Sequence, residues 1–137
     1  MAGSKKKKKK RSWMANRQAG ARATEAVDAG VVVAVSDKTF RDRVLRSPLP
    51  VVVTFVTPDS AICRGIEPAL TELAGQYSGL ARLARVNADR SPKTVRRYDV
   101  HSLPTTLAFK DGELMQTIIG ATSKGELSKL LAWMLRE

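Results

Sequence analysis

Cysteine and histidine are nearly absent from this chain. Its 137 residues include one cysteine, Cys63, and one histidine, His101. A single thiol cannot form an internal disulfide, and these two residues are too few for a zinc cluster or an iron–sulfur site. We therefore expect no metal and no cofactor. So few cysteines fit a reducing, cytoplasmic compartment, and nuclear or organellar locations remain open.

Long apolar runs are also missing. The sequence has no stretch of 18 or more apolar residues, so we expect no membrane span. Nor does an apolar segment typical of a secretory signal stand near its start. A chain of 137 residues is long enough to bury the core of one domain.

Acidic residues are absent from residues 1–24. This segment holds nine of the 24 basic residues, so residues 25–137 hold 15 basic residues against all 13 acidic ones. The net charge of +11 therefore belongs mostly to the start of the chain. Adjacent like charges repel and bury nothing, so we expect residues 1–24 to be a disordered tail. Residues 25–30 are then a linker, and 31–137 the folded domain.

The basic tail has two interpretations. It is an arm that binds a polyanion such as RNA, DNA or another anionic surface, with Trp13 able to stack on a base. Alternatively, it is a solubilising or targeting tail, because a nuclear-import signal or a lysine-rich organellar presequence has similar letters. The candidate polyanion-binding residues are Lys5, Lys6, Lys7, Lys8, Lys9, Lys10, Arg11, Trp13, Arg17 and Arg22.

Apolar patterns after residue 30 alternate between strand and helix. The run 31–35 predicts a strand buried on both faces, and Ser36 or Asp37 is expected to cap a helix carrying Phe40 and Val44. Helices between the early strands require parallel pairing, whereas Asp111-Gly112 predicts an antiparallel hairpin. The result is an α/β domain: a mixed sheet with helices on both faces. The predicted strands are 31–35, 51–56, 80–86, 105–109 and 113–119, and the later helices start near Ser60, Ser91 and Ser123.

Residues 51–70 form the stretch on which the function depends. The apolar segment V-V-V-T-F-V predicts a central strand, followed by a loop and a helix with Ser60 at its N-cap. Cys63 then falls at the third helical position. Pro68 lies inside the helix and is expected to kink it. The lone histidine, His101, is expected to be a surface loop residue.

From about Val31 onward the chain resembles the thioredoxin family. The matching segments are V-V-V-T-F-V, C-R-G-I-E-P-A-L, R-V-N-A-D, R-R-Y-D-V-H-S-L-P-T-T-L-A-F-K-D-G-E and I-G-A-T-S-K-G-E-L. They follow at the family's spacing over about four fifths of the chain, whereas residues 1–30 have no counterpart. The resemblance implies a thioredoxin fold and a cis Leu103–Pro104 bond facing the site.

The resemblance is broken where the family carries its chemistry. Thioredoxins have W-C-G-P-C where this chain has D-S-A-I-C, from Asp59 to Cys63. The resemblance implies that Ser60 replaces the nucleophilic cysteine, while Cys63 keeps the resolving position. It also implies that Thr54 replaces a buried aspartate and Arg85 a lysine. Dithiol exchange needs a second thiol to release the mixed disulfide, so ordinary turnover is not expected.

Two functions remain open. The first is a redox-inactive interaction or scaffold module whose basic arm docks on a ribosome, a transcription complex or another nucleic-acid assembly. The second is a thiol–disulfide oxidoreductase or monothiol redox sensor acting through Cys63; a plain structural subunit is a further option. The resemblance also implies a protein- or peptide-binding groove, formed by Asp59, Ser60, Ala61, Ile62, Leu103, Pro104, Gly120 and Ala121.

Overall fold

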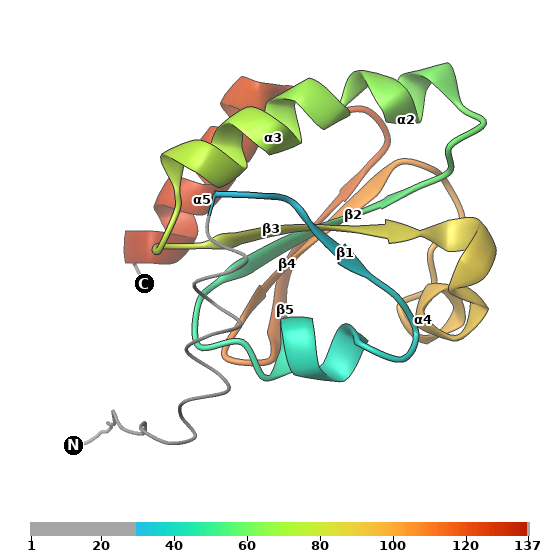
Figure 1. Ribbon diagram of the computed structural model, residues 1–137, viewed down its shortest axis with the longest axis horizontal. Helices are drawn as coiled ribbons and strands as arrows, with labels where there is room; N and C mark the ends of the chain where they lie inside the picture. The colour runs from blue at the N-terminus through green and yellow to red at the C-terminus, as the bar shows by residue number, and fades with distance from the viewer. Residues whose placement is uncertain (1–29, 137) are drawn as a thin grey trace.

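The computed structural model describes residues 30–136 (Figure 1). The predicted tail, residues 1–24, and all of the linker except Gly30 lie outside this part. The strands are β1 (Val33–Val35), β2 (Val51–Val56), β3 (Arg82–Asn87), β4 (Thr105–Lys110) and β5 (Glu113–Ile119). The helices are η1 (Arg41–Leu45), α2 (Ala61–Gly65), α3 (Glu67–Gln76), η2 (Ala88–Arg90), α4 (Pro92–Arg97) and α5 (Lys124–Arg136).

The five strands form one mixed sheet in the order β1-β3-β2-β4-β5. The first three strands pair in parallel, and β4 pairs antiparallel to both β2 and β5. The predicted mixed sheet is therefore confirmed. All six residues of β2 are buried, because this strand lies at the centre of the sheet with helices on both faces.

Each face of the sheet has its own apolar cluster. Helices α2, α3 and α5 cover one face, where Leu70, Leu127 and Met134 pack against Val52 and Ala108. The segments η1 and α4 cover the opposite face, as Figure 1 shows, and pack against the other side of the same strands. The alternation of side chains along β2 thus supplies both clusters.

Two local predictions from turn and cap residues are confirmed. Asp111 and Gly112 have φ of 53° and 81°, which is the left-handed conformation that a tight hairpin requires. At the start of α5, the Glu126 amide donates to Ser123 Oγ (3.1 Å) and the Ser123 amide donates to Glu126 Oε1 (3.3 Å). This reciprocal pair is a capping box.

The prediction that 31–35 is buried on both faces is wrong. Val33 and Val35 are buried, but Val31 and Ala34 are exposed. The reason is position: β1 is an edge strand that pairs only with β3, and of its three residues only Val33 and Val35 join an apolar cluster. An apolar run alone does not distinguish such a strand from a central one.

The predicted cap at Ser36 or Asp37 is also wrong. The next helical segment, η1, is a single π-helical turn that begins only at Arg41 and has no side-chain cap. Asp37 instead reaches α4, where its carboxylate accepts from the amides of Lys93 (3.2 Å) and Thr94 (2.8 Å). The free amides at the start of α4 provide better partners than η1 does.

Candidate functional site

The site is built around the start of α2. Ser60 is extended (φ −101°, ψ 126°), and its Oγ accepts a hydrogen bond from the Cys63 amide at 3.3 Å. Its carbonyl accepts from the Arg64 amide at 3.0 Å, which starts the helix. The prediction of Ser60 as the N-cap is therefore confirmed. A hydroxyl at this position satisfies a helix-terminal amide that otherwise has no partner in the helix.

Cys63 is the third residue of α2, as predicted, and its side chain faces inward. Only 1% of its surface is exposed, and it packs in the apolar cluster that also contains Ile66 and Leu70. Pro68 does not merely kink the helix: α2 ends at Gly65, and α3 begins again at Glu67. A proline cannot donate its amide, so it stands where a new helix starts.

Thr54 lies below α2 in the central strand. Its side chain is completely buried, and its Oγ1 is 3.1 Å from Oγ1 of Thr106 on β4. Each hydroxyl thus has a polar partner inside an apolar core. The resemblance implies a buried carboxylate that helps proton transfer at this position. This chain has a neutral hydroxyl instead, which forms a hydrogen bond with the Thr106 hydroxyl.

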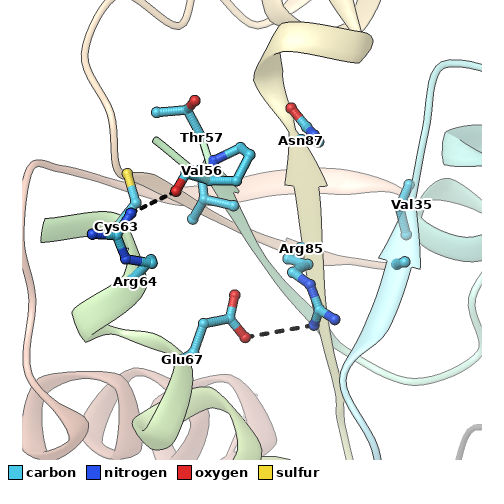
Figure 2. Close-up of a pocket in the computed structure, with 10 residues that line it drawn as sticks. Val35, Val56, Thr57, Cys63, Arg64, Glu67, Arg85 and Asn87 are labelled. Atoms are coloured by element: carbon cyan, nitrogen blue, oxygen red, sulfur yellow. Dashed lines mark hydrogen bonds and ion pairs between the residues drawn. The ribbon is translucent and has the colours of Figure 1, made fainter. Parts of the chain in front are cut away.

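A cavity of about 280 Å³ opens beside α2 at the carboxyl ends of β1, β2 and β3 (Figure 2). Cys63 lies at its wall, and the charged side chains around it are Arg64, Glu67 and Arg85. Arg85 Nη1 is 3.6 Å from Glu67 Oε1, and Arg64 Nη1 donates to the Pro58 carbonyl at 2.6 Å. These interactions hold both guanidinium groups at the rim.

The sequence patterns did not predict this cavity. Open α/β sheets place crevices where strand ends are followed by helices on opposite faces. Here β2 is followed by α2 and α3 on one face, and β3 by α4 on the other. The position of the cavity therefore follows from the order of the strands in the sheet, which local sequence patterns do not specify.

The second half of the predicted groove lies at the same end of the sheet. Phe55 pairs with Thr105, which places Pro104 beside the end of β2. The Leu103–Pro104 peptide bond is cis, and the Pro104 carbonyl accepts from the Gly120 amide at 2.8 Å. The loop before β4 and the loop after β5 are therefore joined at this point.

Exposure differs among the predicted groove residues. Asp59, Ala61 and Ala121 are exposed, and the large apolar side chain of Ile62 on α2 is 63% exposed. Pro104 is buried, whereas Leu103 is partly buried and packs against the cluster that contains Cys63. His101 is exposed, as predicted, and its Nε2 is 2.6 Å from Asp99 Oδ1.

The basic residues predicted to bind a polyanion, Lys5 to Arg22, lie outside the described residues. Among residues 30–136, no group of three or more histidine, cysteine or acidic side chains is placed to hold a metal ion. In the same range, every helix is too short or too polar to cross a membrane.

The sheet, the α2 turn and the cis-proline loop define a thioredoxin-like α/β protein. Comparison with known proteins agrees: the thioredoxin family model matches residues 31–133. The chain is 40% identical over 101 residues to thioredoxin 1 of Synechococcus elongatus, covering 74% of this chain and 94% of that one.

Plastid relatives are similarly close. The chain is 40% identical over 94 residues to the chloroplastic M-type thioredoxin of Chlamydomonas reinhardtii, covering 69% of this chain and 67% of the relative. It is also 40% identical over 107 residues to the M-type thioredoxin of Pisum sativum, covering 78% of this chain and 61% of the relative. The chain belongs to the thioredoxin family.

Proposed function

We propose that this thioredoxin-family protein acts by binding other molecules and not by dithiol–disulfide exchange. The observation that carries the proposal is the pair at the start of α2: Cys63 is the only cysteine of the chain, and position 60 is a serine. Reduction of a disulfide by a dithiol stores two electrons in an intramolecular S–S bond, which needs two sulfur atoms. The Ser60 hydroxyl is a weaker nucleophile than a thiolate, and its oxygen already accepts a hydrogen bond from the Cys63 amide.

The binding activity is assigned to the basic tail. Lys5 to Arg11 are seven adjacent cations, and cations that neutralise phosphates release bound counterions from a nucleic acid. The tail therefore docks on a polyanionic assembly, such as a ribosome or a transcription complex, in a reducing compartment such as the cytoplasm. The folded domain serves as a rigid scaffold held at that assembly.

The groove is proposed as a second binding surface, for a protein or peptide. Ile62 offers an exposed apolar surface, and Asp59 beside it adds a negative charge. A partner segment with an apolar residue next to a basic one would complement this pair. Pro104 and Gly120 are fixed by their backbone hydrogen bond and would form the opposite wall.

Titration of fluorescein-labelled 24-base-pair DNA and 24-nucleotide RNA by fluorescence anisotropy tests the arm. We expect the affinity of the full chain to fall by about 10³-fold or more between 50 and 200 mM salt. Replacing Lys5–Arg11 by glutamine in the full chain should remove most of this dependence. Trp13→Ala, which keeps every charge, separates stacking from electrostatics. Binding that ignores salt, or survives the glutamine variant unchanged, would contradict arm docking.

A second function, as a monothiol redox sensor, is favoured by one observation: Cys63 lines the cavity. A small disulfide in that cavity could form a mixed disulfide with the thiol, releasing the other half as a free thiol. Native protein incubated with glutathione disulfide and weighed by intact-mass spectrometry distinguishes the two. The binding proposal predicts no glutathione adduct on the native wild-type protein. An adduct that forms on native wild type but not on Cys63→Ala would favour the sensor.

A further inference from the structure

Six exposed cations occur in two segments, 38–41 and 90–97, which include the start of η1 and all of α4. Arg41 is the first residue of η1, and Lys38 lies three residues before it. The other four fall within residues 90–97, from the end of η2 through α4. Lys93, Arg96 and Arg97 are spaced three and four residues apart, so they project from one side of α4. We call this set the basic face: Lys38, Arg41, Arg90, Lys93, Arg96 and Arg97.

The two segments of the basic face are held side by side. Asp37, just before Lys38, accepts hydrogen bonds from the Thr94 amide (2.8 Å) and the Thr94 hydroxyl (2.7 Å) on α4. Beneath the surface, the rings of Phe40 and Tyr98 lie with their centroids 5.3 Å apart. Figure 1 shows both segments on the side of the sheet opposite α3 and α5. The segments that carry these cations therefore lie next to each other.

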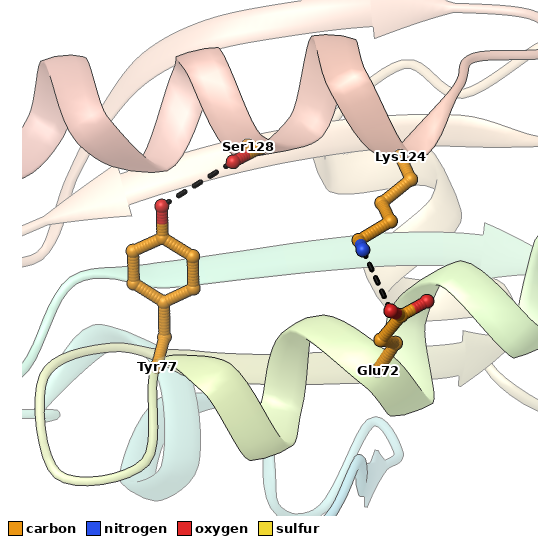
Figure 3. Close-up of polar contacts among 4 residues, drawn as sticks. All are labelled: Glu72, Tyr77, Lys124 and Ser128. Atoms are coloured by element: carbon orange, nitrogen blue, oxygen red, sulfur yellow. Dashed lines mark hydrogen bonds and ion pairs between the residues drawn. The ribbon is translucent and has the colours of Figure 1, made fainter.

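Outside the basic face, Arg46, Arg85 and Lys124 each pair with a carboxylate. On the opposite face, Lys124 Nζ lies 2.7 Å from Glu72 Oε2, next to the Tyr77–Ser128 hydrogen bond that also links α3 to α5 (Figure 3). By contrast, among residues 30–136 no side-chain nitrogen of the basic face lies within 4.0 Å of a carboxylate oxygen. Their charges are available to a partner.

The acidic residues on the same face are already engaged. Asp37 caps α4 and also lies near the Lys93 charge, and Asp42 pairs with Arg46 at 3.0 Å. Asp89 accepts from the Thr57 hydroxyl at 2.7 Å, and Asp99 lies 2.6 Å from His101. These hydrogen bonds leave the carboxylate charges in place, but the six cations of the basic face outnumber the four carboxylates, so the surface keeps a net positive charge.

We propose that the basic face binds the phosphate backbone of a double-stranded nucleic acid. This inference rests on the proposed function and specifies the partner of the docking module. Proteins that bind single strands use exposed aromatic rings as stacking platforms. Here Phe40 and Phe109 are buried and Tyr98 is half-buried against them, so within the described chain this face offers charge without a stacking ring.

The test uses the full chain and the 24-base-pair duplex, with anisotropy measured from 50 to 200 mM KCl. The variant Arg90→Gln/Arg96→Gln/Arg97→Gln removes three charges of the basic face. We expect about a tenfold or greater loss of affinity. The slope of log affinity against log salt concentration should also become shallower by about 0.9 for each phosphate that is no longer neutralised. The matched control Lys124→Gln/Lys129→Gln/Arg136→Gln removes three charges from α5 and should change the affinity by less than about threefold.

The outcomes separate this inference from arm docking. If only the Lys5–Arg11 glutamine variant weakens binding, the basic face does not touch the duplex and the arm proposal stands. If only the basic-face variant weakens binding, the face stands and the arm proposal fails. If the basic-face variant loses as much affinity for a single-stranded 24-mer, or for phosphatidylglycerol vesicles, as it loses for the duplex, the duplex assignment is overturned. If the melting temperature of the triple variant is lower than that of wild type, the three single glutamine variants replace it in the test. Each of them is then expected to weaken binding.

Discussion

The starts of α2 and α4 are both capped by a side-chain oxygen, but the caps serve different surroundings. Ser60 caps its own helix beside a buried thiol, whereas Asp37 caps α4 from 57 residues before Thr94 and anchors an exposed basic surface. At α2 the geometry of a redox site remains although one sulfur is gone. At α4 no redox geometry exists, yet within the described chain no side-chain nitrogen of the basic face lies within 4.0 Å of a carboxylate oxygen. Geometry and chemistry can therefore change independently on one scaffold.

Returning the missing sulfur to α2 should give the largest effect. Ser60→Cys places a second thiol one turn before Cys63, at a helix N-terminus that favours a thiolate. We expect dithiothreitol-driven reduction of insulin, followed by turbidity, to rise about 10²-fold over wild type. Ser60→Ala is the control and should give no gain. An unchanged rate for Ser60→Cys would mean that more than the absent sulfur prevents turnover.

The buried hydroxyl pair beneath α2 sharpens the same comparison. Thr54→Val leaves the Thr106 hydroxyl buried without its partner, which should lower the free energy of unfolding by about 1–3 kcal/mol. The double variant Thr54→Val/Thr106→Val removes both groups and should be more stable than the single one. Urea unfolding measures both. With Thr106→Val measured as the second single variant, a double variant that loses the sum of the two single effects would show that the hydroxyls act independently.

The Asp37 cap at the start of α4 should make the free energy of unfolding depend on pH in the acidic range. Burial raises the pKa of Asp37, but hydrogen bonds from Thr94 and Lys93, with the Lys93 charge, outweigh it and hold the pKa below its ordinary 3.8. The stabilisation is therefore complete above that value and is lost as pH falls through the lower, folded pKa. Asp37→Ala should lose about 1 kcal/mol at pH 7 and show less acid dependence.

Asp37→Asn separates capping from charge. Asparagine still accepts from the α4 amides, so it should keep most of the stability at pH 7 but should not titrate. Urea unfolding between pH 3 and pH 7 compares the three proteins. Parallel curves for wild type and Asp37→Asn would contradict a lowered pKa at this carboxylate.

The smallest effect is expected at the cavity rim. The side chains of Glu67 and Arg85 are 35% and 38% exposed, and their nearest charged atoms are 3.6 Å apart. Such a pair contributes little in water, so Glu67→Gln should change the free energy of unfolding by less than about 1 kcal/mol. Thermal and urea unfolding of Glu67→Gln and Arg85→Gln check this, and a larger loss would indicate a buried pair.

Most of the fold followed from local patterns in the sequence. The β-branched run at 51–56, the Asp111-Gly112 turn and the Ser123–Glu126 capping box each specify a nearby conformation, and all three are present. The Ser60 cap was predictable for the same reason. Its partner, the Cys63 amide, lies three residues away, so the local sequence contains both sides of the interaction.

Features that depend on distant partners were not predictable. Asp37 bonds to α4 across 57 residues, and the exposure of Val31 follows from the edge position of β1. The cavity beside Cys63 depends on which strands are neighbours, and the basic face depends on η1 and α4 sharing one side of the sheet. Such juxtapositions arise only once the topology is set.

Insulin reduction by the wild-type chain, compared with Cys63→Ala, tests the central claim most directly. The assay uses thioredoxin reductase and NADPH as the electron source, so turnover requires a dithiol that can cycle. We predict that the two proteins consume NADPH at the same rate, indistinguishable from the reductase alone. Sustained consumption by wild type that disappears in Cys63→Ala would contradict the account.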